Sequence, residues 1–108
     1  MSRGEGSVSY EVTLEVEPEL LQAVLQELRD HHIPEILKTG CFRAIRLDRI
    51  DDGRLRTRYE AASAADLDRY LQHHTAHFRA DFLARFPTGV RPSREVWQAV
   101  AEWRRDSA

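Results

Sequence analysis

The sequence predicts an α+β domain whose elements follow the order strand, helix, strand, strand, helix, strand. Three observations support this prediction. The segment Val8–Val16 alternates apolar and polar residues without a slip, as a half-buried strand does. Two stretches with apolar residues at helical spacing follow, one after Pro18 and one after Ser63. Between them, the turn signal Asp51-Asp52-Gly53 joins two strand-like segments, which must therefore run antiparallel.

Length and composition restrict the class of protein. The 108 residues are the size of one domain, and 42% hydrophobic with 31% charged residues indicates a globular chain. A formal net charge of −2 argues against a dedicated nucleic-acid binder. No apolar run approaches the roughly 18 residues of a membrane helix, and the N-terminus lacks a secretory signal. A single cysteine fits a reducing compartment. We therefore expect a cytoplasmic protein with no nucleic-acid or membrane partner.

The first helix is expected to begin at Pro18, because proline suits the first helical turn and neighbouring acids favour the helix dipole. Pro34 disfavours a helical conformation at Ile33, so we expect this helix to break or kink near His31–Ile33. A further short turn is expected at residues 35–38. Gly40 is predicted to be its C-terminal cap.

The second half of the chain contains the remaining strands and the second helix. Cys41–Ile50 is predicted as the second strand, with irregular apolar spacing that is typical of a bulge, and Leu55–Glu60 as the third. The second helix is capped by Ser63 and is expected to run to about Phe86. The last strand, Val90–Trp97, contains a proline that indicates a sheet edge.

This order of elements is the ferredoxin-like split βαβ arrangement. Right-handed crossovers place the first and third strands at the centre of the sheet and both helices on one face. We expect the domain to span residues 8–98. Residues 1–7 are expected to form a disordered tail, and residues 99–108 a C-terminal helix or tail.

The opposite face of the sheet is predicted to be polar. Acids and bases on the first and third strands can pair across it; they are Glu11, Glu15, Arg56, Arg58 and Glu60. The RNA-recognition module shares this topology but needs aromatic side chains on the open face to stack bases, so we reject that function. Such a face can be exposed to water, or it can meet a second sheet in a dimer.

Several segments resemble a bacterial family of small proteins of unknown function. They are Tyr10–Val16, His31–Glu35, Thr39–Phe42, Arg58–Glu60, Arg85–Pro87 and Ser93–Val96, within residues 8–98. That family is similar to the dimeric α+β-barrel group, which includes antibiotic-biosynthesis monooxygenases and stress-response barrels. The resemblance implies a dimer of two ferredoxin-like subunits packed sheet to sheet. It implies a site inside each subunit or at the subunit interface, but no particular reaction.

Polar residues gather around the expected break at Pro34. His31, His32 and Glu35 could share a proton or a metal ion there. The alternative is that His32 and Glu35 cap the helix end and satisfy free backbone groups. Of the two roles, we favour capping of the helix end by His32 and Glu35.

The second helix carries three histidines. His73 and His77 are four residues apart, a spacing that can bind zinc, and Asp81 continues the row. The spacing is unspecific, and His74 projects onto the apolar face. We expect no metal requirement for folding and no cofactor.

Other reactive side chains have structural explanations. Cys41 is expected to be a buried structural thiol. Four arginines could bind a carboxylate or phosphate if they converge, although cross-strand pairing is favoured; they are Arg46, Arg56, Arg58 and Arg94. Trp97 and Trp103 could anchor an interface or pack on the sheet edge.

The expected function is a homodimeric binding or interaction module, with a small molecule or another protein as the open choices of partner. The runner-up is a cofactor-independent oxygenase or isomerase acting on an apolar small molecule in an enclosed pocket. An apolar pocket of about 300 Å³ or more with two or three convergent polar groups would favour the enzyme. The candidate site residues are His32, Glu35, Tyr59, His74 and Arg94.

Overall fold

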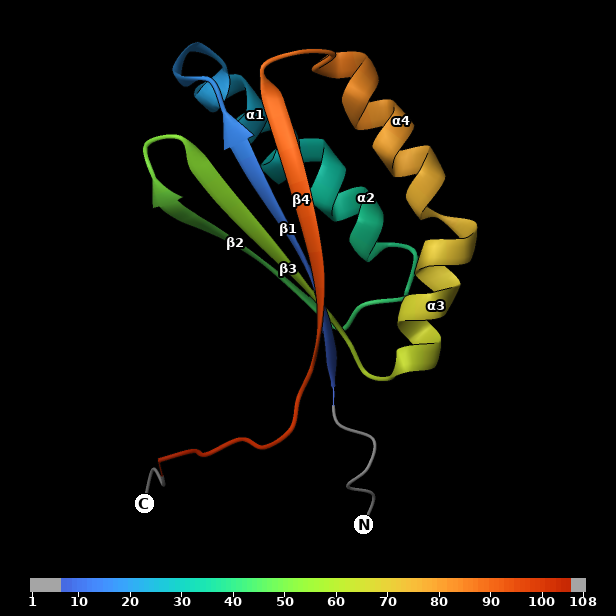
Figure 1. Cartoon of the computed structure of the whole chain (residues 1–108). Helices are drawn as coiled ribbons and strands as arrows, with labels where there is room; N and C mark the ends of the chain where they lie inside the picture. Colours follow the sequence, from blue (N-terminus) through green and yellow to red (C-terminus); the bar gives the residue numbers. More distant parts are fainter. Residues whose placement is uncertain (1–6, 106–108) are drawn as a thin grey trace.

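The structure is a computed structural model that describes residues 7–105. Its elements are β1 (Val8–Val16), the 3₁₀ turn η1 (Pro18–Leu20), α1 (Leu21–Glu27), the π-helical turn η2 (Leu28–His32), α2 (Ile33–Leu37), β2 (Ala44–Asp51), β3 (Arg54–Ala61), α3 (Ala64–His73), α4 (Thr75–Arg85) and β4 (Val90–Gln98). The four strands form one antiparallel sheet in the order β2-β3-β1-β4, with the helices on one face (Figure 1). The predicted ferredoxin-like fold, with the first and third strands at the centre, is confirmed. None of the helices in residues 7–105 is long and apolar enough to cross a membrane.

The period-two pattern of β1 decides which side chains meet the helices. Tyr10 and Leu14 are buried on the helix-facing side. Val12 lies between them on the same side, opposite Thr57 of β3 and opposite Arg94 of β4. Residues that pair in register share a face, so Thr57 and Arg94 also point toward the helices.

The first helical segment does not break at Pro34, but its regular α-helix is interrupted next to the expected position by the π turn at Leu28–His32. Ile33 has helical dihedral angles, φ −67° and ψ −45°, and its N–H donates to the carbonyl of Leu28, five residues earlier. This wider π turn accommodates a proline ring that would clash with the preceding turn of a regular α-helix. The chain therefore stays helical from Pro18 to Leu37.

The second helical segment is divided where one helix was expected. Ser63 caps α3 as predicted, because its Oγ accepts a hydrogen bond of 3.2 Å from the Asp66 N–H. At His74 the backbone leaves the helical region, with φ −126° and ψ −31°, and α4 begins at the next residue. No proline or glycine marks this break. His74 instead stacks on Tyr70, with ring centroids 6.1 Å apart.

The second strand begins later than predicted, at Ala44. Cys41 and Phe42 precede it in a buried loop, where both pack in the core. The expected bulge is present near the other end of the strand, where the register with β3 shifts between Arg49 and Asp51.

Two clusters of buried side chains form the core. One surrounds Tyr10, Tyr59 and Phe42, and the other surrounds Leu14 and Leu28. Val12 packs against both clusters, so the central strand of the sheet connects them.

The chain beyond β4 forms a tail without helical structure in residues 99–105. Trp103 is 88% exposed and does not pack on the sheet edge, whereas Trp97, in edge strand β4, is 52% exposed and only partly covered. The predicted N-terminal tail, apart from Ser7, and residues 106–108 lie outside the described residues.

Candidate functional site

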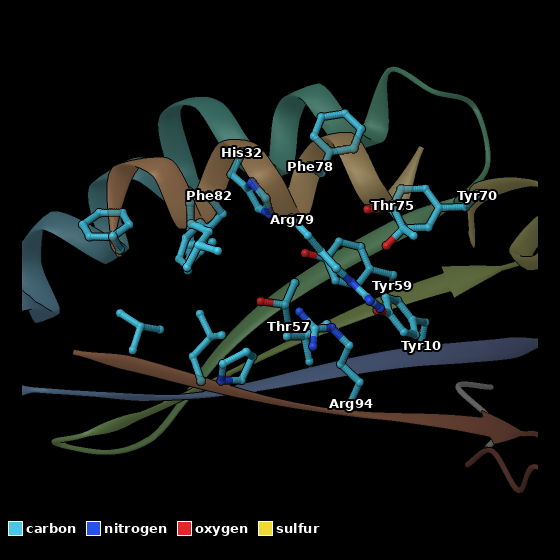
Figure 2. Close-up of a pocket in the computed structure, with 17 residues that line it drawn as sticks. Tyr10, His32, Thr57, Tyr59, Tyr70, Thr75, Phe78, Arg79, Phe82 and Arg94 are labelled. Atoms are coloured by element: carbon cyan, nitrogen blue, oxygen red, sulfur yellow. The ribbon is translucent and has the colours of Figure 1, made fainter. Parts of the chain in front are cut away.

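A cavity of about 260 Å³ lies between the sheet and α4 (Figure 2). Its floor comes from β1, β3 and β4, and its roof from η2, α3 and α4. We call this cavity the pocket. Much of its wall is aromatic, formed by Tyr10, Tyr59, Tyr70, Phe78, Phe82 and Phe86. Aromatic walls with few polar groups are typical of small-molecule sites.

Helix α4 forms the roof of the pocket because its inward-facing side chains do not fill the space between the helix and the sheet. Thr75, Phe78 and Phe82 follow one another at helical spacing and line the pocket. None of the α4 residues is fully buried. The helix therefore covers the sheet without filling the space beneath it.

Two arginines reach the pocket from opposite walls. The Arg79 Nη2 donates a hydrogen bond of 3.0 Å to the Tyr10 hydroxyl, which connects α4 to β1. Arg94 enters from β4, and Figure 2 shows both side chains extending toward the region beside Tyr10 and Tyr59. The pocket thus combines an aromatic interior with two permanent positive charges.

Tyr59 and Tyr70 stay protonated near neutral pH. Burial raises the pKa of the Tyr59 hydroxyl, and the Arg94 charge offsets only part of that rise. Burial also raises the pKa of Tyr70 to about 12, although a hydrogen bond with Thr75 favours the ionised form. Both hydroxyls are therefore neutral groups that can donate a hydrogen bond to a ligand oxygen.

His32 lines the pocket from η2 rather than capping a helix end. Its ring lies 5.1 Å from the Phe82 ring and 6.0 Å from the Phe78 ring, centroid to centroid. Its Nδ1 is buried without a hydrogen-bond partner among the described residues. Burial lowers the pKa of this imidazole despite the opposing charges of Glu27 and Asp81, so the ring is neutral at pH 7.

The expected capping role of His32 and Glu35 is wrong. Among the described residues no side chain caps the N-terminus of α2, because the π turn leaves no break there, and at its C-terminus it is Thr39 that donates a hydrogen bond of 2.7 Å to the Ile36 carbonyl. Glu35 instead forms an exposed ion pair of 3.0 Å with Lys38.

The structure brings three of the five candidate residues together. His32, Tyr59 and Arg94 line the pocket, whereas Glu35 and His74 do not. Sequence reasoning missed Arg79 as a site residue. The signal was weak, because Arg79 only adjoins the apolar stripe by following Phe78, and Thr75 and Leu83 lie four residues to either side of it.

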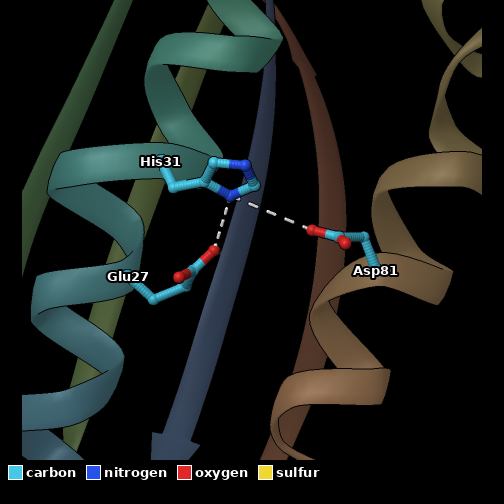
Figure 3. A group of neighbouring side chains, drawn as sticks. All are labelled: Glu27, His31 and Asp81. Carbon is cyan, nitrogen blue, oxygen red and sulfur yellow. Dashed lines mark hydrogen bonds and ion pairs between the residues drawn. The ribbon is translucent and has the colours of Figure 1, made fainter.

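Outside the pocket, a cluster of polar side chains joins α1 and η2 to α4 (Figure 3). The ligand atoms of Glu27, His31 and Asp81 all lie within 4.8 Å of one another, a set that could hold a metal ion. The Arg85 Nε lies 3.2 Å from Glu27 and 3.5 Å from Asp81, so a guanidinium already neutralises both carboxylates. His73 and His77 are exposed and outside this group.

The four arginines that could have converged lie on two faces of the sheet. Arg58 pairs with Glu11, and Arg46 and Arg56 both pair with Asp48, on the face away from the helices. Arg94 faces the pocket instead. Cys41 is 1% exposed in the core, as expected for a structural thiol.

Several solved structures have the same fold. A protein of unknown function from Nitrosomonas europaea is 16% identical, with a TM-score of 0.70 over 95% of this chain and 98% of that one. A dimeric ferredoxin-like protein from an uncultured marine organism is 16% identical, with a TM-score of 0.67 over 92% and 100%. A monooxygenase of Streptomyces coelicolor, in complex with the ligand nanaomycin D, is 12% identical, with a TM-score of 0.71 over 94% of each chain. These likenesses show the fold alone.

The sequence comparisons place the chain in one family. Among curated proteins, none matches. One family, described as a domain of unknown function, matches residues 7–100, which includes every element of the sheet and every residue of the pocket. The chain therefore belongs to the DUF4286 family.

Proposed function

We propose that this protein binds a small, flat, mainly apolar molecule in the pocket. The observation that carries this proposal is an aromatic cavity with polar groups converging from η2, α4, β3 and β4. A tightly packed core would leave no cavity of this volume, because voids larger than a water molecule are few in protein interiors. The monooxygenase of the same fold that holds nanaomycin D supports a ligand-binding role.

The volume limits the size of the ligand. At about 260 Å³, the pocket is slightly below the common range of about 300–1,000 Å³ for sites that hold drug-sized molecules. We therefore propose a ligand of one or two fused rings. Ring stacking against Phe78, Phe82 and Tyr59 would supply most of the contact area.

Binding is tested by titrating the ¹⁵N-labelled protein with 2-naphthamide, a neutral two-ring probe, and following backbone NMR shifts. We expect shifts at β1, α4 and β4 residues of the pocket. Val12→Phe places a ring on the pocket floor and should abolish these shifts. Val100→Phe makes the same change in the exposed tail and should leave them unchanged. Shifts restricted to the tail, or none in the parent protein, would contradict the proposal.

A second candidate function is cofactor-independent oxygenation or isomerisation of the bound molecule. The neutral imidazole of His32 favours it, because this ring lines the pocket and a neutral imidazole can accept a proton from a ligand. Oxygen uptake in the presence of a bound hydroxylated two-ring probe tests the oxygenase. His32→Gln should remove uptake without removing binding. Uptake at the same rate in the variant would exclude His32 as the base.

We propose further that the protein works as a homodimer in the cytoplasm. The dimeric ferredoxin-like protein of the same fold supports self-association. So does the open face of the sheet, where charged side chains pair with one another and Trp97 is exposed at the edge. The buried free thiol of Cys41 fits a reducing compartment.

A further inference from the structure

The walls of the pocket carry an uneven charge. Two arginines and no aspartate or glutamate are among its 17 lining residues. The whole chain has 18 acidic and 16 basic side chains. A positive pocket in a slightly acidic protein attracts an anionic ligand and disfavours a cationic one.

The two pocket arginines also differ from those on the open face of the sheet. There, Arg58 lies 3.0 Å from Glu11 and Arg91 lies 2.7 Å from Glu15. Within residues 7–105, neither Arg79 nor Arg94 has a carboxylate at ion-pair distance. The side chain of Arg79 bonds to the hydroxyl of Tyr10, which is not a carboxylate. Their charges remain available for a group that enters the pocket.

The two charges act on adjacent rings. Arg79 bonds to Tyr10, and the charge of Arg94 acts on the Tyr59 hydroxyl. The Tyr10 and Tyr59 rings lie 5.8 Å apart, centroid to centroid. Figure 2 shows the Arg79 guanidinium beside Tyr10 and the Arg94 guanidinium beside Thr57, approaching from opposite walls of the pocket. A single acidic group beside the tyrosines could therefore meet both arginines.

We infer that the ligand is an aromatic carboxylate whose acid group is held by Arg79 and Arg94 and whose rings lie against Phe78 and Phe82. This inference rests on the proposed binding function and names its ligand class. The planar guanidinium matches a planar carboxylate with two parallel hydrogen bonds, which favours that anion over a phenolate with one oxygen. The neutral tyrosine hydroxyls add donors beside the same group.

The test compares two probes of equal shape by isothermal titration calorimetry at pH 7. They are 2-naphthoate, which carries the charge, and 2-naphthamide, which lacks it. We expect naphthoate to bind at least about tenfold more tightly, since a charge-assisted hydrogen bond is roughly twice as strong as a neutral one. Arg94→Gln should remove this preference, because it should weaken the binding of naphthoate much more than that of naphthamide. Arg29→Gln, which makes the same charge change on an exposed residue outside the pocket, should preserve it.

The outcomes separate this inference from the proposed function. Equal affinity for both probes, or a preference that survives in either Arg94→Gln or Arg79→Gln, overturns the carboxylate held by both arginines and leaves the pocket as a site for a neutral molecule. Failure of both probes to bind overturns the proposed function as well. Circular dichroism of each variant confirms that it is folded before its affinity is compared.

Discussion

The His32 side chain bears on both the stability and the chemistry of the protein. Its ring contributes apolar contact with Phe78 and Phe82, while its buried Nδ1 makes no hydrogen bond within the described residues. A buried polar atom without a partner costs about 1–3 kcal/mol. A group that costs stability and faces a cavity is typical of a functional position.

Replacing His32 with leucine should therefore raise the free energy of unfolding by about 1 kcal/mol, because the aliphatic side chain keeps the packing and removes the unpaired atom. Urea denaturation measures the change. Glu35→Ala is the control and should change stability by less than about 0.5 kcal/mol, because it removes only an exposed ion pair. A loss of about 1 kcal/mol or more in His32→Leu would show that the imidazole has a structural partner.

His32 should also make stability depend on pH. Its folded-state pKa lies below the ordinary 6.5, so the unfolded chain takes up a proton more readily than the folded one. Stability should thus fall as the pH decreases from 7.5 through 6.5 toward the folded pKa, by at most about 1.4 kcal/mol per pH unit. The parent should lose more stability over this interval than His32→Leu. Parallel pH curves for the two proteins would be inconsistent with the lowered pKa.

A backbone hydrogen bond joins the start of the first helical segment to the start of the last strand. The Glu17 N–H donates a hydrogen bond of 2.9 Å to the Gly89 carbonyl, which joins the start of η1 to the start of β4. Gly89 has φ +84°, and a Cβ there would clash with Leu20. Gly40 has a similar φ of +78° but open space around it.

Alanine substitutions at these two glycines can be compared directly, because the backbone conformations are similar and only the surroundings differ. Gly40→Ala should cost roughly 1 kcal/mol, the penalty of a left-handed conformation for an L-residue. Gly89→Ala should cost more, because the end of the Leu20 side chain must also move away from the new Cβ. Chemical denaturation of both variants provides the comparison. An equal loss in the two would show that the approach at Gly89 relaxes without cost.

The elements that could be predicted from sequence are those fixed by local patterns. The alternation in β1, the Ser63 cap and the hairpin at Gly53 each depend on neighbouring residues, and each is present. Pro34 signals an irregularity in the first helical segment but not its π form, and no proline or glycine marks the break at His74. The expectation that proline breaks a helix assumes a regular α-helix, and here a π turn takes its place before Pro34.

The same distinction applies to the pocket. Tyr59 and Arg94 could be placed on the helix-facing side once strand register was assumed, but whether that side was filled depended on how far α4 stands from the sheet. Nothing in the helical periodicity specifies that separation. Arg79 was overlooked because a lone cation in a helix usually faces water, and its bond to Tyr10 joins positions 69 residues apart.

At the scale of the whole molecule, the helices cover one face of the sheet and leave the other open (Figure 1). Glu11 on the open face is only 7% exposed, since the pair it forms with Arg58 screens it. Trp97 lies on the same face of edge strand β4, opposite Ser9 of β1. A second copy packed against this face would bury the tryptophan and enclose the charged pairs.

Sedimentation equilibrium at micromolar concentration should therefore give twice the 12.5 kDa mass of the chain. Trp97→Glu should shift the protein toward the monomer, because it places a charge on the exposed ring's position in the proposed interface. Leu37→Glu, at an exposed position in α2, should leave the mass unchanged. A parent protein that sediments only as a monomer would contradict the dimer.

The claim that the cavity between the sheet and α4 holds a ligand is tested most directly by a crystal structure of the protein grown with the tighter of the two naphthyl probes. We expect the rings to lie between Val12 on the floor and Phe78 and Phe82 on the roof, with the polar end beside Arg94. Probe density only outside the cavity, or a collapsed cavity in which α4 rests directly on the sheet, would contradict it.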